Sequence, residues 1–329
     1  MILVTGATGH IGNVLVRKLI KNGEKVRALI WQGEDTSPLE DLEVEKFEGD
    51  VLEIRSLKSA FQGIEIVYHL AGVISIMPGR QPLVWRVNVE GTRNVIRVAK
   101  QAGIKRLIYT SSIHAIKRIE TGLIDESLPY DVNNPYGAYD SSKAQASLEV
   151  QHAAHDGLNA VIVCPTGVIG PYDFRRSEMG QVILDAVDQK PSPYIDGAYD
   201  FVDVRDVASG LMLAAEKGRQ GESYILSGAH ISVRYLLETI QEITGKGFFR
   251  FKLPRQFAEL CAKFTPLYYS LTKSKPRFTP YSLEVLKSNS QISHAKATTE
   301  LGYHPRPLYE SLKDTVHWFL DNRSFLVKV

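Results

Sequence analysis

The first twelve residues constrain the fold more than any other segment. A short apolar run at residues 1–4 is followed at once by Thr5-Gly6-Ala7-Thr8-Gly9-His10-Ile11-Gly12. Apolar residues at helical spacing then continue over residues 13–22, and Gly23 is a natural helix stop. A buried strand, a glycine turn and a helix, in this order, are the parts of a dinucleotide-binding crossover.

At each glycine of this loop, the absence of a side chain has a physical purpose. Gly6 permits the tight turn, Gly9 has no side chain to block a pyrophosphate, and Gly12 lets the helix pack close to the strand. The free N–H groups and the positive dipole end of the helix then face the phosphates. An ordinary glycine-rich connection is the alternative, and the motifs further along the chain favour nucleotide binding.

Strand and helix patterns alternate through the first half of the chain. Strands are predicted at 25–30, 44–47, 64–71, 106–110 and 160–164, and helices at 53–62, 83–102, 135–156 and 178–188. Short strands at 201–204 and 223–226 are expected to return to the sheet, and another is expected at 248–252. This alternation predicts an α/β fold, a doubly wound parallel Rossmann sheet with a smaller, mostly helical C-terminal substrate lobe.

Each of the two predicted lobes is built from two separate segments of the chain. The nucleotide-binding domain takes residues 1–168 and about 195–228, and the substrate lobe takes about 169–194 and 229–329. The cleft between them is the expected substrate site.

Composition excludes several classes of function. The net charge of +2 is too small to indicate nucleic acid as a partner, and no apolar stretch is long enough to span a membrane. The two cysteines form no disulfide framework and the chain opens directly into a strand, so we expect a cytoplasmic protein. The nine histidines are not joined by a cluster of other ligands, so no metal site is expected.

The strongest chemical signal is Tyr139 followed four residues later by Lys143, because this spacing places both side chains on one helix face. An ammonium group near a phenol lowers the phenol pKa, which would suit Tyr139 to proton exchange with a substrate oxygen. Thr110, Ser111 and Ser112 follow a strand at the sheet edge where ligands bind, and a serine hydroxyl there can hold that oxygen. A solvated helix face is the alternative for the Tyr/Lys pair alone.

Taken together, the motifs resemble the extended short-chain dehydrogenase/reductase family over nearly the whole chain. The resemblance rests on the glycine loop and on these further runs: Gly49-Asp50-Val51, His69-Leu70-Ala71-Gly72, Asn88-Val89-Glu90-Gly91-Thr92, Thr110-Ser111-Ser112, Tyr139 with Lys143, Cys164-Pro165-Thr166-Gly167-Val168-Ile169-Gly170-Pro171, and Phe201-Val202-Asp203-Val204-Arg205-Asp206-Val207-Ala208.

The resemblance implies roles for single residues. Ser112, Tyr139 and Lys143 would be catalytic, with Ser111 as the alternative serine. The cofactor would be bound by residues of the strand ends and loops: Gly6, Thr8, Gly9, His10, Ile11, Gly12, Trp31, Asp50, Val51, Leu70, Ala71, Gly72, Thr110, Tyr139, Lys143, Pro165 and Val168. Asn88 could equally be a polar group bonded to backbone. A homodimer through the long helices is compatible with the resemblance, although some members are monomers.

The cofactor is expected to be NADP, with NAD as the alternative. The second strand ends in Leu29-Ile30-Trp31-Gln32, without the acid that binds the ribose hydroxyls in NAD-preferring members, and without the Arg often found at the place of Trp31 in NADP-preferring members. The missing acid removes a source of repulsion for a 2′-phosphate. Arg27, Lys18 and His10 are other candidate phosphate neighbours.

The substrate is expected to be an apolar ketone or secondary alcohol. Nucleotide-sugar epimerases and dehydratases typically carry an Arg where this chain has Tyr199, which weakens the epimerase or dehydratase alternative. The runs Ser293-His294-Ala295-Lys296-Ala297 and Leu301-Gly302-Tyr303-His304-Pro305-Arg306-Pro307-Leu308 resemble the dihydroflavonol-reductase and 3β-hydroxysteroid-dehydrogenase branch. A non-catalytic cofactor sensor is a further alternative, but it would not need the Ser/Tyr/Lys set.

Candidate substrate-contacting residues follow the cofactor-binding strand ends. They are Val73, Ile74, Ile113, His114 and Thr166, with Ile76 and Met77 continuing the same wall. The aromatic-rich segment 257–271 is expected to pack on the lobe, with a lid or a membrane contact as the alternatives.

Overall fold

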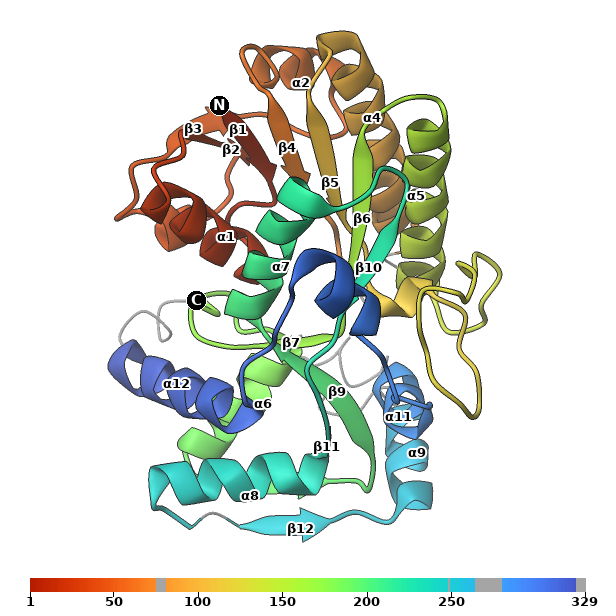
Figure 1. Cartoon of the computed structure of the whole chain (residues 1–329). Coiled ribbons are helices and arrows are strands. Elements are labelled where there is room, and N and C mark those ends of the chain that lie inside the picture. The colour runs from red at the N-terminus through yellow and green to blue at the C-terminus, as the bar shows by residue number, and fades with distance from the viewer. Residues whose placement is uncertain (75–80, 248, 264–279, 324–329) are drawn as a thin grey trace.

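The computed structural model describes residues 1–74, 81–247, 249–263 and 280–323. Its centre is a seven-stranded sheet in the order β10-β6-β5-β4-β1-β2-β3, with every neighbouring pair parallel (Figure 1). The strands are β1 (Ile2–Thr5), β2 (Val26–Ile30), β3 (Glu45–Glu48), β4 (Ile66–His69), β5 (Arg106–Thr110), β6 (Ala160–Pro165) and β10 (Ser223–Leu226). The predicted doubly wound parallel sheet is confirmed.

Helices cover both faces of this sheet. One face packs against α2 (Ile54–Ala60), α4 (Gly91–Ala102) and α5 (Ala138–His155), through residues such as Leu57, Val95 and Val150. The other face packs against α1 (His10–Lys21) and α7 (Val204–Lys217), through Val14 and Val207. Neighbouring residues of one strand enter opposite cores, as period-two alternation requires.

Register brings the functional strand ends together. Thr5 of β1 lies opposite His69 of β4, and His69 lies opposite Tyr109 of β5. The segments that follow these three strands, beginning at Gly6, Leu70 and Ser111, therefore leave the sheet along one edge. In a parallel sheet this carboxyl edge is where ligands bind.

A long predicted helix at 83–102 is interrupted in the structure. It consists of α3 (Gln81–Trp85), a π-helical turn η2 (Arg86–Glu90) and α4. Asn88 lies in the π-helical turn, fully buried. Such turns occur often at functional sites, because they re-aim one side chain without ending the helix.

The prediction that residues 201–204 return to the main sheet is wrong. They belong to β9 (Ala198–Asp203), which pairs with β7 (Gly167–Ile169) and β11 (Ala229–Ser232) in a separate three-stranded sheet. Val202 packs into a core cluster of the main sheet, while Phe201 packs against α6 (Glu178–Val187), α8 (Val233–Thr244) and α12 (Leu308–Asp321). A β9 strand wedged between two cores alternates like any half-buried strand, so its sequence does not reveal which sheet it joins.

Two further strands and two further helices lie at the end of the molecule that carries α8 (Figure 1). A two-stranded sheet pairs β8 (Ser192–Tyr194) with β12 (Arg250–Lys252), followed by α9 (Arg255–Lys263) and α11 (Pro280–Lys287). Short 3₁₀ turns lie at Ser37–Leu39 (η1) and Ile113–Ala115 (η3), and a second π-helical turn, η4, at Ala297–Leu301. In the described part of the chain, no helix combines the length and the apolar character needed to cross a bilayer.

Candidate active site

Two glycines of the loop, Gly6 and Gly12, lie where a side chain has no room. Gly6 has φ 69°, in the left-handed region, and a Cβ there would lie 2.7 Å from the Ala71 backbone nitrogen. A Cβ on Gly12 would lie 2.0 Å from the Gly6 carbonyl oxygen. The loop therefore packs its backbone against the chain that follows β4, and the N-terminus of α1 opens beside it. This is a cradle that fits the pyrophosphate of a dinucleotide.

A buried histidine fixes the strand ends around this cradle. His69 contacts the Thr5 hydroxyl at 2.7 Å through Nδ1 and the Thr92 hydroxyl at 3.0 Å through Nε2. Burial, with a smaller effect of the Lys143 charge, lowers the pKa of His69 to about 3, so the ring is neutral. Thr5 Oγ1 also accepts the Ala71 N–H at 3.1 Å, which places Ala71 against Gly6.

The Tyr139 phenol is buried at the beginning of α5, and the Ser112 side chain is its hydrogen-bond partner. Ser112 Oγ also accepts the His114 N–H at 3.2 Å, which holds the hydroxyl at the end of β5. Ser111, the alternative serine, instead contacts Ser147 Oγ at 2.6 Å inside the core. Of the two serines, only Ser112 therefore meets Tyr139.

Lys143 lies one helical turn further along α5. Its ammonium donates to the Thr110 carbonyl oxygen at 2.8 Å and is nearly inaccessible to solvent. A Cβ on Gly72 would lie 3.5 Å from Lys143 Nζ. The residues after β4 thus connect the glycine loop, through Ala71 and Gly72, with the Tyr/Lys pair.

The predicted lowering of the Tyr139 pKa is wrong. Burial raises the pKa of Tyr139 to about 12, and the Ser112 hydrogen bond opposes this rise only in part. Burial lowers the pKa of Lys143 to about 8. Desolvation outweighs attraction here because both groups are enclosed by the sheet edge, which the Tyr-x-x-x-Lys spacing alone does not indicate.

A polar cluster that the sequence analysis did not find surrounds the beginning of α5. Asp140, fully buried, accepts hydrogen bonds from Arg118 Nη2 at 2.8 Å and from the Tyr281 hydroxyl at 2.7 Å. The Arg118 guanidinium carbon lies 3.8 Å from the centre of the Tyr136 ring. Burial raises the Asp140 pKa, and the Tyr281 hydrogen bond and Arg118 oppose that rise. Contacts so far apart in sequence leave no local pattern.

His114 belongs to the same cluster. Arg118 Nη2 lies 3.3 Å from His114 Nδ1, and the Tyr199 hydroxyl lies 2.9 Å from His114 Nε2. A guanidinium only donates, so Nδ1 accepts and the ring proton is on Nε2, which donates to Tyr199. Burial, and then the Arg118 charge, lower the pKa of His114 to about 3. Tyr199, at the place of the epimerase arginine, is thus a buried partner of His114.

The predicted cofactor residues lie in several environments. Asp50 Oδ1 accepts the Leu52 N–H at 2.8 Å, and Val51 packs into the core beside Gly91. Pro165 ends β6, and Leu70, Ile11 and Val168 border the core, partly buried. The Trp31 side chain is 60% exposed. Thr110 Oγ1 is buried without a hydrogen-bond partner among the described residues.

Asn88 has the structural role that the sequence left open. Its Oδ1 accepts the Val73 N–H at 2.8 Å, and its Nδ2 donates to the Val73 carbonyl and, at 2.9 Å, to Ser142 Oγ. This side chain joins the segment after β4 to α5. It thereby sets the distance between the glycine loop and the Tyr/Lys pair.

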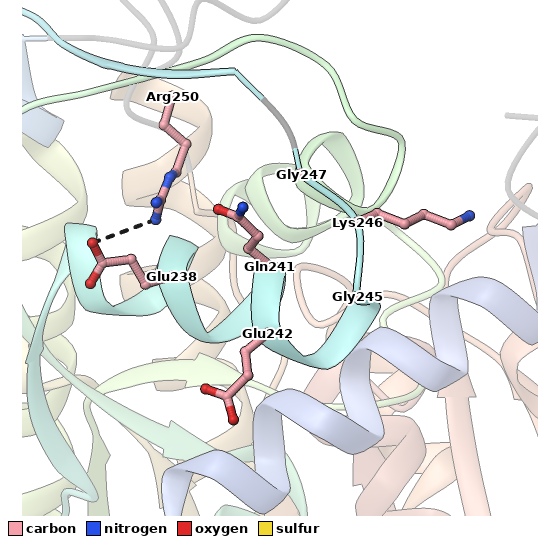
Figure 2. Close-up of a pocket in the computed structure, with 7 residues that line it drawn as sticks. All are labelled: Glu238, Gln241, Glu242, Gly245, Lys246, Gly247 and Arg250. Atoms are coloured by element: carbon pink, nitrogen blue, oxygen red, sulfur yellow. Dashed lines mark ion pairs between the residues drawn. The ribbon is translucent and has the colours of Figure 1, made fainter.

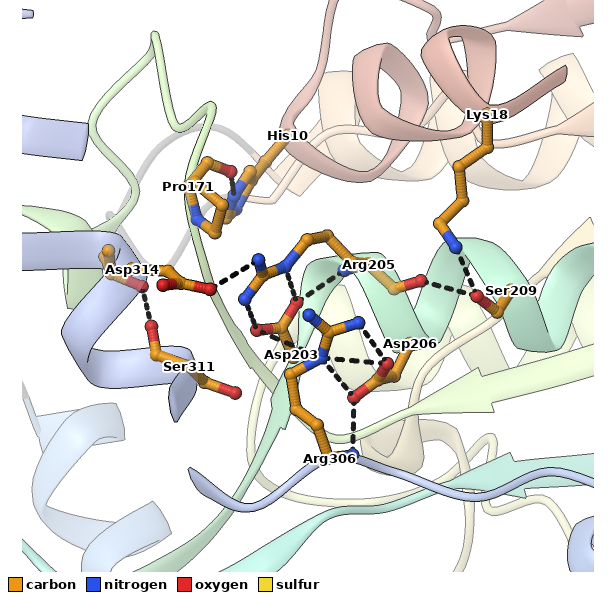
Figure 3. A network of polar contacts seen from close by, with 11 residues as sticks. His10, Lys18, Pro171, Asp203, Arg205, Asp206, Ser209, Arg306, Ser311 and Asp314 are labelled. Carbon is orange, nitrogen blue, oxygen red and sulfur yellow. Dashed lines mark hydrogen bonds and ion pairs between the residues drawn. The ribbon is translucent and has the colours of Figure 1, made fainter. Parts of the chain in front are cut away.

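The candidate phosphate neighbours named from the sequence have other partners. Arg27 Nε donates to Glu45 at 2.9 Å, and Lys18 Nζ donates to Ser209 Oγ at 2.6 Å. His10 Nε2 contacts the Pro171 carbonyl at 3.0 Å. Figure 3 shows Lys18 and His10 beside the ion pairs that Arg205 forms with Asp203 and Asp314, and Arg306 with Asp206.

A carboxylate does approach the glycine loop, although the second strand itself ends without an acid. Glu34 Oε1 accepts the Thr8 hydroxyl at 2.6 Å, and Arg175 pairs with the same oxygen at 2.6 Å. The sequence analysis missed Glu34 because it lies three residues past Trp31, in a polar turn. Arg175 follows β7 and lies 141 residues after Glu34 in the sequence.

The candidate substrate residues do not all face one space. Ile113 is buried in the core and the Ile74 side chain is 73% exposed, while Val73 is partly buried. Thr166 Oγ1 donates to Asp200 at 2.6 Å. Ile76, Met77 and residues 264–271 lie outside the described residues, and Phe257 of α9 is exposed.

A separate hollow lies away from the main sheet (Figure 2). Figure 2 shows it beside α8, lined by Glu238, Gln241, Glu242, Gly245, Lys246, Gly247 and Arg250. None of these residues belongs to the glycine loop or to the Ser112/Tyr139/Lys143 group. The described residues contain no cluster of three or more metal-binding side chains.

Comparison with known proteins agrees with this geometry. The family model for the NAD-dependent epimerase/dehydratase family matches residues 2–227. The chain belongs to this family. A sterol demethylase protein B of Methylococcus capsulatus is 36% identical, over 96% of this chain and 97% of its own length.

Two further members of the family bear on the predicted branch. A 3β-hydroxysteroid dehydrogenase/decarboxylase of Arabidopsis thaliana is 31% identical over 79% of this chain and 63% of its own length. The crystal structure of gox2253 is 32% identical, with a TM-score of 0.85 and 98% of each chain covered. Dihydroflavonol-reductase names also occur among the relatives. The predicted extended short-chain dehydrogenase/reductase branch of the family is confirmed.

Proposed function

We propose that this protein is an NAD(P)-dependent oxidoreductase that interconverts a ketone and a secondary alcohol on an apolar small molecule. The observation that carries the proposal is the buried group of Ser112, Tyr139 and Lys143 at the sheet edge that also holds the glycine loop. A non-catalytic sensor would need the loop but not this group.

The cradle around Gly6, Gly9 and Gly12 fits a dinucleotide, and the unpartnered Thr110 hydroxyl group offers a further polar contact. A bound nicotinamide supplies the hydride in reduction and accepts it in oxidation. Lys143, whose Nζ lies beside Gly72, is placed to hold the ribose of that nucleotide. Pro165 and Val168 would border the nicotinamide, and Asp50 and Val51 the adenine.

The protein's own residues then supply the proton and hold the oxygen. With a pKa of about 12, Tyr139 is protonated at neutral pH and can donate to the oxygen of a ketone as it becomes an alkoxide. Ser112 donates a hydrogen bond to the same oxygen. In oxidation the transfers run in reverse, and Lys143 favours the transient phenolate of Tyr139 through its positive charge.

An apolar substrate is supported by the environment of Tyr199. An epimerase or dehydratase typically carries an arginine there to bind a diphosphate, whereas Tyr199 is buried, uncharged and paired with His114. The branch resemblance, with relatives named for sterol and hydroxysteroid chemistry, points the same way.

The test is consumption of NADPH, and separately of NADH, with a panel of flavonoid, steroid and simple aromatic ketones, followed by the loss of near-ultraviolet absorbance. We expect consumption with at least one apolar ketone. No consumption across the panel, together with cofactor that stays bound through purification, would instead favour nucleotide-sugar epimerase or dehydratase chemistry.

A further inference from the structure

Three side chains from separate segments meet at the glycine loop. Thr8 Oγ1 donates to Glu34 Oε1 at 2.6 Å and accepts from Arg175 Nη2 at 2.5 Å, and Arg175 Nη2 also reaches Glu34 Oε1 at 2.6 Å. Thr8 lies between Gly6 and Gly9, so both charges of the ion pair are held against the loop itself. We call these three residues the Thr8 triangle.

Glu34 is anchored rather than freely exposed. Its second oxygen, Oε2, accepts the Trp31 N–H at 3.0 Å, which ties the carboxylate to the end of β2. The Glu34 side chain is 18% exposed, while that of Arg175 is 47% exposed. The carboxylate is therefore held within the loop's surroundings, and the guanidinium is the partner more open to solvent.

The position of the Thr8 triangle indicates which part of a dinucleotide would lie beside it. In a sheet of this topology, the end of β2 beside the glycine loop is where the adenosine ribose of a dinucleotide lies. A carboxylate there accepts hydrogen bonds from a 2′-hydroxyl, and a guanidinium there binds a 2′-phosphate through two parallel hydrogen bonds. Arg27 and Lys18 donate to other partners, whereas Arg175 contacts the loop itself through Thr8.

We propose that Glu34 and Arg175 together determine how the protein distinguishes a 2′-hydroxyl from a 2′-phosphate on the cofactor. Glu34 accepts from the hydroxyl of NAD(H), and Arg175 screens Glu34 and binds the phosphate of NADP(H). The pair thus removes the repulsion that an unpaired Glu34 would exert on the phosphate. This inference rests on the proposed function, because it presumes that a nicotinamide dinucleotide binds at the loop.

The test is the ratio of the dissociation constants of NADPH and NADH, measured by fluorescence titration without any substrate. Arg175→Gln exposes Glu34 to the phosphate, so NADPH binding should weaken by about tenfold or more while NADH binding changes little. Glu34→Gln removes the repulsion and frees Arg175, so NADPH should bind more tightly and NADH less tightly.

Arg93→Gln is the matched control. Arg93 pairs with Glu149 at 2.5 Å and is 48% exposed, much like Arg175, but it lies on α4 away from the loop. This variant should keep the wild-type ratio. Thermal unfolding of each variant, and competition by adenosine 2′,5′-bisphosphate against AMP, separate a local effect on the 2′ position from a loss of folding.

The outcomes are distinct. The inference is supported if the ratio of the NADPH to the NADH dissociation constant rises in Arg175→Gln and falls in Glu34→Gln. Equal effects on both nucleotides, or a ratio unchanged in both variants, would overturn it and leave the proposed function standing. Wild-type protein that binds neither nucleotide would overturn the proposed function itself.

Discussion

The Tyr281 hydroxyl donates a 2.7 Å hydrogen bond to Asp140, the residue that directly follows Tyr139 on α5. Arg118 binds the other oxygen of the same buried carboxylate at 2.8 Å. This contact joins α11 to the helix turn that carries the proposed proton donor. The position of Tyr139 therefore depends on a residue that lies 141 positions away from its neighbour in the chain.

Replacing Tyr281 by Phe should destabilise the protein by about 1–3 kcal/mol at pH 7, because one oxygen of the buried Asp140 loses its donor. Loss of that hydrogen bond raises the Asp140 pKa further. A raised carboxyl pKa costs stability above the unfolded-state pKa and costs none once the group is protonated, so the deficit should shrink toward pH 4. Urea unfolding at both pH values measures it, with the exposed Tyr235→Phe as control. An equal deficit at both pH values would contradict this account.

Lys143 should give the protein an unusual alkaline dependence of stability. Its pKa is lowered to about 8 by burial, so between about pH 8 and 10.5 the unfolded chain binds more protons at this site than the folded one. Stability relative to Lys143→Met should therefore rise across this window, by on the order of 3 kcal/mol in all.

The measurement is denaturant unfolding of wild type and Lys143→Met from pH 7 to 10. Comparing the two proteins cancels the titration of all other groups. The unfolding free energy of wild type minus that of Lys143→Met should increase with pH. A difference that does not change with pH would mean that the ammonium is solvated.

His114 should remain neutral well below the usual histidine range. Its pKa is lowered to about 3 by burial and by Arg118, and its proton lies on Nε2, where it is donated to Tyr199. The ¹⁵N shifts of its ring should show the Nε2–H tautomer, unchanged from pH 8 to 5, with the exposed His152 ring as an internal comparison. A ring that gains a proton near pH 6 would show that the cluster is open to water.

Much of the fold follows from local pattern. The strands at 106–110 and 223–226 were predicted with their bounds, and the other strands of the main sheet differ at their ends by one or two residues, because apolar runs bounded by glycine and proline leave few alternatives. The position of Ser112 at the sheet edge also follows, since parallel strands share a carboxyl edge, whereas Tyr139 reaches it from α5.

Other features depend on long-range contacts that no local pattern encodes. Glu34 reaches Thr8 only because the turn after β2 folds back, and Arg175 and Tyr281 each lie 141 positions along the chain from the carboxylate they contact. The Tyr139 pKa was predicted with the wrong sign because the spacing reveals a neighbouring charge but not the extent of burial. The π-helical turn at Arg86–Glu90 continues the helical period closely enough to be hidden in the sequence.

The most direct test of the central claim is the rate of NAD(P)H oxidation by wild type and by Tyr139→Phe, with a ketone that the wild type reduces. The substitution removes one hydroxyl and keeps the buried ring, so cofactor affinity and thermal stability should be close to wild type. Without the proton donor, kcat should fall by about 10²–10⁴-fold. Unchanged turnover in Tyr139→Phe would contradict the proposed chemistry.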